Sequence, residues 1–418
     1  MSKSVLSRKS IRGAAIAAAA ALALVALPAT ASAASSKSKK LVGASNVSMF
    51  VEPDSGVQPV VDFIDSARKT IDYGMYQLED PKLPSWTPIS DALKRARARG
   101  VKVRVMTTWQ TFPANSSTTP GDPEPKDIEY CEYNSNMPVL NSLKASGVST
   151  ALSPFMYTYY HEKIAIADGN YSFGKALIMD FNSQVSYFGP DPRYGGAGAR
   201  GFGVISTNRA DVKEIQQTFD ADFPPVTTPP SFKRPSLIWS PNGPGFKPKS
   251  QGFNRIMQLI DTADKTLDVY VLLLDYAPVR ARLIAAAKRG VQVRVIFNTS
   301  GPRAMTYGQL KEMSAAGIQF GHDPTNSVGS IFVHTKTVLR DAADSDRMAY
   351  VGSMNVGDYV SVNSERELGV LLSKKSITDT IANTYATDWA SATKLQFVDG
   401  VPANPFPEPK GRTDYCGG

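Results

Sequence analysis

The chain repeats itself, and this repeat limits what it can fold into. The stretch FIDSARKTIDYGMY (63–76) matches LIDTADKTLDVYVL (259–272), and RARARGVKVRVMTT (95–108) matches AAAKRGVQVRVIFN (285–298). Further on, QQTFDADF (216–223) matches NTYATDW (383–389) at its aromatic, Asp and aromatic positions. A chain of 418 residues has room for such a duplication. The sequence therefore predicts one duplicated fold made of two similar lobes.

Each half predicts helices that alternate with strands. A predicted helix at 88–99 stops at Gly100, and an apolar strand follows at 101–106. Its copy is a helix at 278–289 followed by a strand at 291–297. Such an alternation favours a mainly parallel or mixed sheet that is covered on both faces. The predicted class is therefore α/β.

A proline-rich segment divides the two lobes. FPPVTTPPSFKRP (223–235) contains five prolines, which predict a stiff, extended linker. We place the N-terminal lobe at 44–222 and the C-terminal lobe at 236–400. Residues 401–418 remain as a C-terminal tail.

The first 33 residues have the pattern of a signal peptide. An apolar run at 14–27 leads to Ala31-Ser32-Ala33, an A-x-A cleavage site, and it follows four basic residues, Lys3, Arg8, Lys9 and Arg12. A membrane anchor is the alternative, but the run is shorter than the ~20 residues that a span needs. We expect cleavage near Ala33 and a secreted, extracellular protein.

Cleavage also changes the charge. The chain has 46 Lys and Arg residues against 38 Asp and Glu, so removal of the four basic residues leaves 42 against 38, a net charge of +4. A mildly positive protein suits several kinds of anionic substrate, and this charge does not separate lipid from nucleic acid.

Cys131 and Cys416 are the two cysteines of the chain. Export permits a disulfide, which would tie a long loop to the C-terminal tail. Two unpaired thiols are the alternative, and alkylation without reductant would reveal them. Neither cysteine has a neighbourhood typical of a metal ligand.

Two of the three histidines begin the same pattern, HxKxxxxD. The copies are HEKIAIAD (161–168) and HTKTVLRD (334–341). A histidine meets this pattern by chance about once in a few hundred cases. The alternation around His161 and Lys163 predicts a strand with both side chains on one face. An imidazole and an ammonium side by side, present twice, suit attack on a phosphoryl group.

At these motifs the chain resembles the phospholipase D superfamily, and the resemblance covers nearly the whole mature region. It implies two α/β lobes related by a pseudo-twofold axis, with the active site at their interface. It also implies phosphodiester cleavage through a covalent phosphohistidine, with no metal in the chemistry. The chain contains no H-E-x-x-H, P-loop or dinucleotide fingerprint, so we propose no cofactor.

The resemblance assigns further residues in the second half. Gly352-Ser353-Met354-Asn355 is the family's GSxN turn, and Glu367 matches a carboxylate that orients a catalytic imidazole. Nearby Glu365 is expected at an exposed charged edge. The first half departs from the pattern: Met179-Asp180-Phe181-Asn182 replaces the turn, and Gly201 stands where Glu367 stands. Asp180 could compensate, although a carboxylate repels a phosphate unless it is protonated or turned away.

The implied roles are as follows. Lys163 and Lys336 offset the charge of the phosphoryl group, and Ser353, Asn182 and Asn355 add hydrogen bonds. Family resemblance favours His161 as nucleophile and His334 as acid and base, which the residues alone do not rank. Asp168 and Asp341 are expected to orient the imidazoles or to close the lobe interface. The third histidine, His322, is interpreted as a loop residue without a role.

The expected substrate is a phospholipid at a membrane or micelle interface, cleaved by a monomer. The aromatic segment 156–160 before His161 fits either a rim for lipid or a buried strand. An extracellular nuclease is an alternative, since Arg95, Arg97 and Arg99 give one helix a basic face. A binding protein that has lost catalysis is a second alternative. The complete His, Lys and Asp of both motifs argue against it, because an inactive site does not need these six residues.

Overall fold

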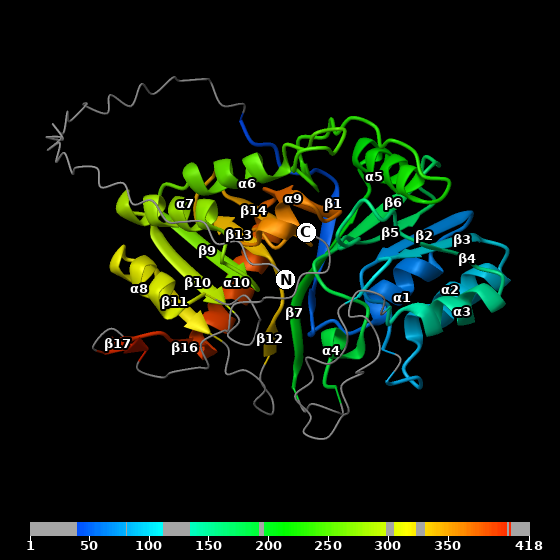
Figure 1. Ribbon diagram of the computed structural model, residues 1–418, viewed down its shortest axis with the longest axis horizontal. Helices are drawn as coiled ribbons and strands as arrows, with labels where there is room; N and C mark the ends of the chain where they lie inside the picture. The colour runs from blue at the N-terminus through cyan, green and yellow to red at the C-terminus, as the bar shows by residue number, and fades with distance from the viewer. Residues whose placement is uncertain are drawn as a thin grey trace, which may run out of the picture. The chain divides into compact units, whose positions relative to one another are not determined.

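Two mixed β-sheets form the framework of the protein (Figure 1). The computed structural model describes residues 40–80, 82–111, 134–191, 196–297, 305–322, 331–398 and 401–402. Both sheets belong to one compact unit, Leu41–Gly418. The predicted signal peptide and both cysteines, Cys131 and Cys416, lie outside the described residues, and so does nearly all of the tail.

The first sheet contains the first HxK motif. Its strands follow the spatial order β1-β7-β6-β5-β2-β3-β4, and β2, β3 and β4 are mutually parallel while the other pairs are antiparallel. The strands are β1 (Val47–Glu52), β2 (Thr70–Met75), β3 (Lys102–Thr107), β4 (Ser149–Leu152), β5 (Lys163–Ala167), β6 (Lys175–Met179) and β7 (Gly198–Ser206). The helices of this lobe are α1 (Gln58–Asp65), α2 (Pro88–Ala98), α3 (Met137–Ala145), α4 (Val185–Phe188) and α5 (Arg209–Asp222).

The second sheet repeats this order as β8-β15-β14-β13-β9-β10-β11, and β16 is added at its end. Its strands are β8 (Leu237–Ser240), β9 (Thr266–Val271), β10 (Gln292–Phe297), β11 (Gln319–His322), β13 (Thr337–Arg340), β14 (Met348–Gly352), β15 (Glu367–Leu372) and β16 (Thr393–Lys394). The helices are α6 (Gly252–Asp261), α7 (Ala277–Lys288), α8 (Tyr307–Ala315), α9 (Tyr359–Asn363) and α10 (Lys375–Ser391). A small hairpin, β17 (Phe397–Val398) with β18 (Val401–Pro402), follows. The duplicated α/β fold is confirmed.

The repeated helices begin and end for the same local reasons. Prolines stand in the first turn of both α2 and α7, where a fixed φ suits the helix and no amide donor is needed. Gly100 and Gly290 follow the helices with φ of 87° and 96°, a left-handed conformation that favours glycine. The predicted helices and strands lie within two residues of the observed ones.

The apolar core has three clusters, of which the central one joins the lobes. Each lobe has its own cluster between its sheet and its outer helices. The central cluster takes side chains from both lobes, among them Phe202, Val333, Trp239 and Tyr270. A fully buried apolar side chain contributes about 1.5–3 kcal/mol, so this shared cluster holds the two sheets together.

A short segment of each lobe also pairs with a strand of the other lobe. Strand β12 (Ile331–Val333), just before His334, pairs in parallel with β7 of the first sheet. Figure 1 shows β12 beside β7 at the middle of the molecule. In the opposite sense, Tyr160 forms a parallel bridge with Arg366 at the entry to β15. Both motif histidines therefore follow segments that are held by the opposite lobe.

The segment between the lobes, 223–235, contains neither helix nor strand. The backbone amides of Lys233 and Arg234 both donate to the Glu214 carboxylate on α5, at 2.7 and 2.9 Å. The linker is thus tied to the first lobe near its end. Among the described residues, no helix has the length and apolar character to cross a membrane.

Candidate active site

The two HxK motifs converge on a buried site between the lobes. His161, Lys163, His334 and Lys336 are all at least nine-tenths buried. The lysines interact electrostatically with each other, and so do the histidines. The predicted strand positions need a correction, because β5 begins at Lys163 and β13 at Thr337. Both histidines precede their strands, in the segments that contact the other lobe.

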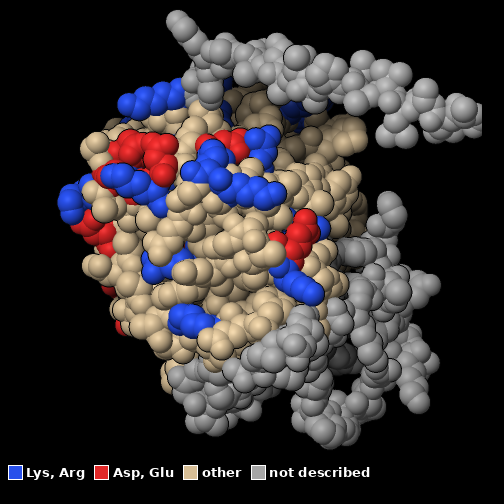
Figure 2. All heavy atoms as spheres, turned by 90° about the vertical axis from the view of Figure 1, so that its left-hand side faces the viewer, with Lys and Arg blue, Asp and Glu red and all other residues tan. Residues whose placement is uncertain are grey.

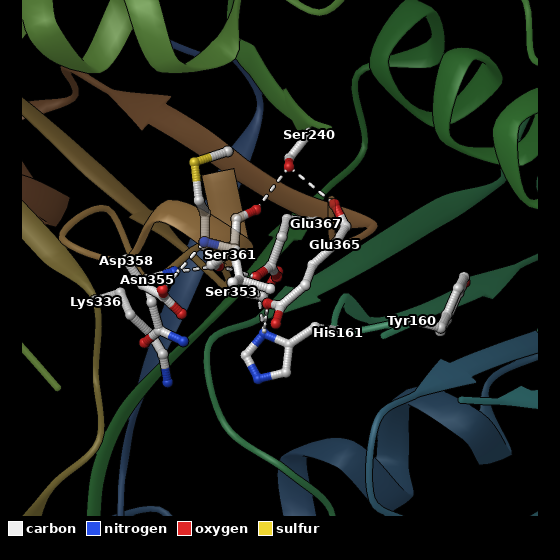
Figure 3. Close-up of polar contacts among 12 residues, drawn as sticks. Tyr160, His161, Ser240, Lys336, Ser353, Asn355, Asp358, Ser361, Glu365 and Glu367 are labelled. Atoms are coloured by element: carbon white, nitrogen blue, oxygen red, sulfur yellow. Dashed lines mark hydrogen bonds and ion pairs between the residues drawn. The ribbon is translucent and has the colours of Figure 1, made fainter. Parts of the chain in front are cut away.

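Glu367 orients the first-motif histidine from across the interface. The Glu367 Oε1 atom lies 2.8 Å from His161 Nδ1, and the Ser361 hydroxyl also donates to Oε1 (Figure 3). A proton held on Nδ1 by this carboxylate leaves the Nε2 lone pair available for attack. The family carboxylate thus has the expected contact, with the imidazole of the opposite half.

His334 has a different environment, because the matching carboxylate is replaced by Gly201. Its Nδ1 and Nε2 atoms lie 3.0 and 3.1 Å from Lys336 Nζ, and the backbone of Asp180 partly opposes the lowering of its pKa. The Asp180 carboxylate accepts from the Phe202 amide at 2.8 Å and from the Thr335 hydroxyl. A Cβ on Gly201 would lie 2.6 Å from Phe181 Cδ1 and 2.9 Å from Asp180 Oδ1, so the glycine makes room for the Phe181 ring and for this carboxylate. Asp180 therefore supports the His334 segment and turns its charge towards Thr335.

The two lysines form a site for an anion, because their ammoniums are buried and repel each other. Lys336 Nζ donates to the His334 carbonyl at 2.6 Å, and Lys163 Nζ donates to the His161 carbonyl. Burial lowers the pKa of Lys163 to about 8, although Glu367 opposes this. Burial and the charge of Lys163 hold the pKa of Lys336 well below its usual value. An anionic phosphoryl group would satisfy both ammoniums and reverse these shifts.

The imidazoles are neutral near neutral pH. Burial lowers the pKa of His161 to about 4, with Glu367 acting in the opposite direction. Burial and the charges of Lys336 and Lys163 lower the pKa of His334 well below its usual value. A bound phosphodiester anion offsets the lysine charges, which raises the pKa of His334 and lets it carry the proton that it later donates.

The expected hydrogen-bond donors divide into two groups. Asn182 and Asn355 are buried, and the Nδ2 atom of Asn182 donates to Gln77 Oε1 at 3.3 Å and to the Tyr187 hydroxyl at 3.1 Å. Among the described residues, the acceptor atom Oδ1 of each Asn has no hydrogen-bond partner. Ser353 is committed elsewhere, because its hydroxyl accepts from the Leu368 amide at 3.1 Å and donates to the Leu368 carbonyl at 3.2 Å. Ser353 therefore fixes the start of β15, next to Glu367, which corrects its expected contact with phosphate.

The expectation for the motif aspartates was wrong. Asp168 accepts from the backbone amides of Arg68, Lys69 and Thr70 at 3.0, 2.6 and 2.9 Å. Asp341 makes the same three contacts in the second lobe, with the amides of 264–266 at 3.0, 2.7 and 2.9 Å. These carboxylates fasten the motif strand to the turn before β2 or β9. They act within their own lobes and touch neither imidazole.

Asp168→Ala is expected to lower the free energy of unfolding by about 3 kcal/mol or more. The change removes an acceptor from three amides, and it places Ala at a φ of 56°, which Ala tolerates poorly. Asn suits this conformation and keeps one acceptor oxygen, so Asp168→Asn should cost about 1 kcal/mol. Urea unfolding measures both. A loss below about 1 kcal/mol in the Ala variant would contradict the assignment.

Other sequence expectations also change. Glu365 was expected to be exposed, but it is buried, with Oε2 at 3.7 Å from His161 Nδ1. Burial and the charge of Glu367 raise its pKa well above the usual value, so it carries a proton. His322 is a buried residue at the end of β11 rather than a loop residue.

The segment before His161 was expected to be either an exposed rim for lipid or a buried strand, and it is part buried and part exposed. Tyr157, Tyr159 and Tyr160 are buried, whereas Phe155 and Met156 are 77% and 52% exposed. Two tyrosines contact the imidazoles edge-on, and the sequence did not predict either contact. Tyr76 lies 4.9 Å from His161, and Tyr187 lies 4.9 Å from His334, between ring centroids. No spacing rule in the sequence joins these residues to the motifs.

His161, Glu365 and Glu367 bring donor atoms within 4.8 Å of one another, the spacing of a possible metal site. The Oε1 atom of Glu367 is already used by His161 and Ser361, and Lys163 lies close enough to interact with both carboxylates. This positive charge disfavours a divalent cation at these donors. A second group, Asp264, Asp341 and Asp346, has its Asp341 oxygens occupied by backbone amides.

Comparisons with known proteins agree with this geometry. The family described as "Cardiolipin synthase, PLD-like domain" matches residues 60–183 and 256–389, so each match contains one HxK motif. Cardiolipin synthase A of Proteus mirabilis is 30% identical over 148 residues, 31% of this chain. The major cardiolipin synthase ClsA of Bacillus subtilis is 32% identical over 148 residues, 32% of this chain. Each of these alignments covers 29% of the relative's length.

Two solved structures share the fold at low identity. Phosphatidylserine synthase of Haemophilus influenzae superimposes with a TM-score of 0.58 at 10% identity, over 85% of this chain and 89% of that one. Polyphosphate kinase of Porphyromonas gingivalis gives a TM-score of 0.56 at 13% identity, over 82% of this chain and 50% of that one. The duplicated two-lobe arrangement therefore recurs in proteins of different named activity.

Proposed function

The chain belongs to the cardiolipin synthase and phospholipase D-like domain family of phosphodiesterase-type enzymes, and we propose that it cleaves the headgroup phosphodiester of phospholipids through a covalent phosphohistidine. One observation carries this proposal: two imidazoles and two ammoniums, one pair from each lobe, meet in a single buried site. The lysines supply fixed positive charge, and the imidazoles supply a nucleophile and a proton donor.

In the first step, the Nε2 lone pair of His161 attacks phosphorus while the bond to the headgroup oxygen breaks. His334 gives its proton to that oxygen, and the headgroup alcohol leaves. In the second step, His334 takes a proton from water, and the resulting hydroxide attacks phosphorus. The phosphorus–nitrogen bond breaks, which releases phosphatidic acid and restores His161. Lys163 and Lys336 offset the added negative charge of both transition states.

Two observations support a phospholipid as substrate. The relatives with 30% or more identity are named as synthases of cardiolipin, which is itself a phospholipid. In addition, Phe155 and Met156 are exposed apolar side chains on the segment that leads to His161. Such side chains can enter the apolar boundary of a bilayer or micelle. If an alcohol replaced water in the second step, the phosphatidyl group would be transferred to that alcohol instead of being hydrolysed.

An extracellular nuclease is the alternative on the same chemistry. The predicted basic face of α2 is partly neutralised, because Arg95 and Arg99 both pair with Asp65 at 2.7 and 2.9 Å. On the side of the molecule at the left of Figure 1, basic and acidic side chains lie next to one another (Figure 2). A mixed surface attracts a phosphate backbone less than a continuous basic stripe does. A binding protein without catalysis is disfavoured because both pairs of His and Lys are in place.

The substrate test compares headgroup release with DNA cleavage. Vesicles of phosphatidylcholine or phosphatidylethanolamine and a supercoiled plasmid are incubated with the protein, and His334→Ala serves as blank. We expect free choline or ethanolamine with phosphatidic acid, and intact plasmid. Adding glycerol tests transfer, since phosphatidylglycerol would then form. Plasmid cleavage that falls steeply with salt, without headgroup release, would support the nuclease instead.

We also propose that the protein is secreted as a monomer after cleavage near Ala33. The A-x-A pattern supports the cleavage, and the presence of both motifs in one chain supports the monomer. N-terminal sequencing of the exported protein and light scattering test these two points. An unprocessed N-terminus on membrane-bound material would favour the anchor. The disulfide between Cys131 and Cys416 stays a prediction.

A further inference from the structure

A buried arginine reaches across the lobe interface immediately beside Glu367. The Nε and Nη2 atoms of Arg366 donate to the two carboxylate oxygens of Asp222, at 2.7 and 3.1 Å. Arg366 belongs to the second lobe, and Asp222 is the last residue of α5 in the first. The Nη1 atom donates to the carbonyl of Ser240 at 3.1 Å, and the Tyr157 hydroxyl donates to Asp222 at 2.8 Å. Both ions are almost completely buried.

The opposite half contains corresponding contacts, and there Arg200 Nη1 also pairs with Asp54 Oδ2 at 3.0 Å. Arg200, which precedes Gly201, donates through Nε and Nη2 to the two oxygens of Asp388 on α10, at 2.8 and 2.9 Å. Its Nη1 atom donates to the carbonyl of Glu52 at 2.9 Å. The Tyr270 hydroxyl donates to Asp388 at 2.6 Å. Here the arginine comes from the first lobe and the aspartate from the second.

The arginines, aspartates and carbonyls of the two sets are copies by strand register as well as by sequence, whereas Tyr157 and Tyr270 come from different positions in their lobes. Glu52 pairs with Gly201 in the first sheet, and Ser240 pairs with Glu367 in the second. Arg200 therefore binds the carbonyl of the residue paired with Gly201, and Arg366 binds the carbonyl of the residue paired with Glu367. Asp222 and Asp388 are the aspartates of the matching segments 216–223 and 383–389.

The backbone of each arginine holds the segment that presents one motif histidine. The amide of His161 donates to the carbonyl of Arg366 at 2.9 Å, and the amide of Arg366 donates to the carbonyl of Tyr159 at 3.0 Å. On the other side, Arg200 pairs with Val333, the residue before His334. Each histidine segment pairs with a strand of the opposite lobe. The arginine on that strand binds an aspartate of the histidine's own lobe and so fixes the strand in place.

We propose that Arg366 with Asp222 and Arg200 with Asp388 are two positioning pairs, each of which sets the place of one histidine. This inference rests on the proposed function. The pair Arg366–Asp222 supports His161 and so governs formation of the phosphohistidine. The pair Arg200–Asp388 supports His334 and so governs its hydrolysis. A bidentate guanidinium fixes both distance and angle, which the single ammonium of lysine does not.

The test uses a diester with a p-nitrophenol leaving group in a stopped-flow spectrophotometer. Nitrophenolate departs without a proton donor. The rate of the first turnover therefore measures attack by His161, and the steady-state rate measures hydrolysis of the phosphohistidine, which needs His334. Wild-type protein, Arg366→Lys and Arg200→Lys are compared. Arg104→Lys is the matched control, because Arg104 makes a bidentate pair with Asp72 inside one lobe, at 2.6 and 2.8 Å.

We expect opposite kinetic signatures from the two variants. Arg366→Lys should slow the first turnover by at least about tenfold and show no burst. Arg200→Lys should release close to one nitrophenolate per site in a burst and then turn over at least about tenfold more slowly. Arg104→Lys should stay within about twofold of wild type. Thermal unfolding is measured alongside, and folded variants with these signatures support the positioning role.

Equal slowing of both phases by the two variants, or rates that fall only as far as in Arg104→Lys, would overturn the pairs as positioning devices. If a variant does not fold, Asp222→Asn or Asp388→Asn replaces it, and the same signatures are required of each. Failure of the proposed function is recognised separately. In that case the wild-type protein itself releases no nitrophenolate, and the assignment of the pairs to two chemical steps falls with it.

Discussion

Replacing His161 with Asn is expected to lower kcat/KM for phosphodiester cleavage by at least about 10⁴-fold, with the fold intact. Asn offers an amide at the place of Nδ1, so Glu367 keeps a hydrogen-bond donor, but the Nε2 lone pair that attacks phosphorus is gone. His322→Asn is the control, since it also removes a buried imidazole, one that lies beside Phe297 in the second lobe. Headgroup release and circular dichroism are measured for both variants. Activity of the His161 variant within about tenfold of wild type would contradict the assignment.

Glu367→Gln is expected to lower kcat by about 10³–10⁴-fold, because an amide no longer holds the proton of His161 on Nδ1. The variant also changes the pH profile. Burial lowers the pKa of His161 to about 4, and Glu367 opposes that shift. Without this carboxylate the pKa falls further. His161 attacks only when neutral, so the acidic limb of kcat/KM should move to lower pH.

The neighbouring carboxyl group provides the matched control for this variant. Glu365 lies near the same nitrogen but carries a proton, because burial and Glu367 raise its pKa. Glu365→Gln is therefore nearly neutral in charge and shape, and we expect kcat within about threefold of wild type. An acidic limb that moves to higher pH in Glu367→Gln, or a normal kcat, would remove Glu367 from its role.

The sequence was informative where information is local or repeated. The duplicated segments predicted two lobes, and glycines 100 and 290 predicted the helix ends within two residues. The edge strands β1 and β8 were not predicted as strands. Their pairing partners lie far away in the chain, since Val47 pairs with Ser206 and Ser240 with Glu367. The residue pattern within a short stretch of sequence does not show such long-range pairing.

The site was predicted by residue type better than by contact. Both pairs of His and Lys meet as the motif suggests, and Glu367 contacts an imidazole 206 residues earlier in the chain. The aspartates were misassigned, because the motif fixes Asp five residues after Lys and seven after His but does not say that its carboxylate binds three backbone amides of its own lobe. Glu365 was recoverable: it shares a face with Glu367 at a period of two, so burial of one predicts burial of the other.

Direct capture of the covalent intermediate tests the central claim, that two lobes form one site for attack by His161. A short-chain phosphatidyl diester of p-nitrophenol, whose leaving group needs no proton donor, is mixed with His334→Ala, which slows hydrolysis of the intermediate, and the reaction is quenched in alkali because phosphohistidine is unstable in acid. After proteolysis, mass spectrometry identifies the modified peptide. We expect a phosphatidyl group on His161, with one nitrophenolate released per site. An adduct on another residue, or full turnover with no adduct, would contradict the account.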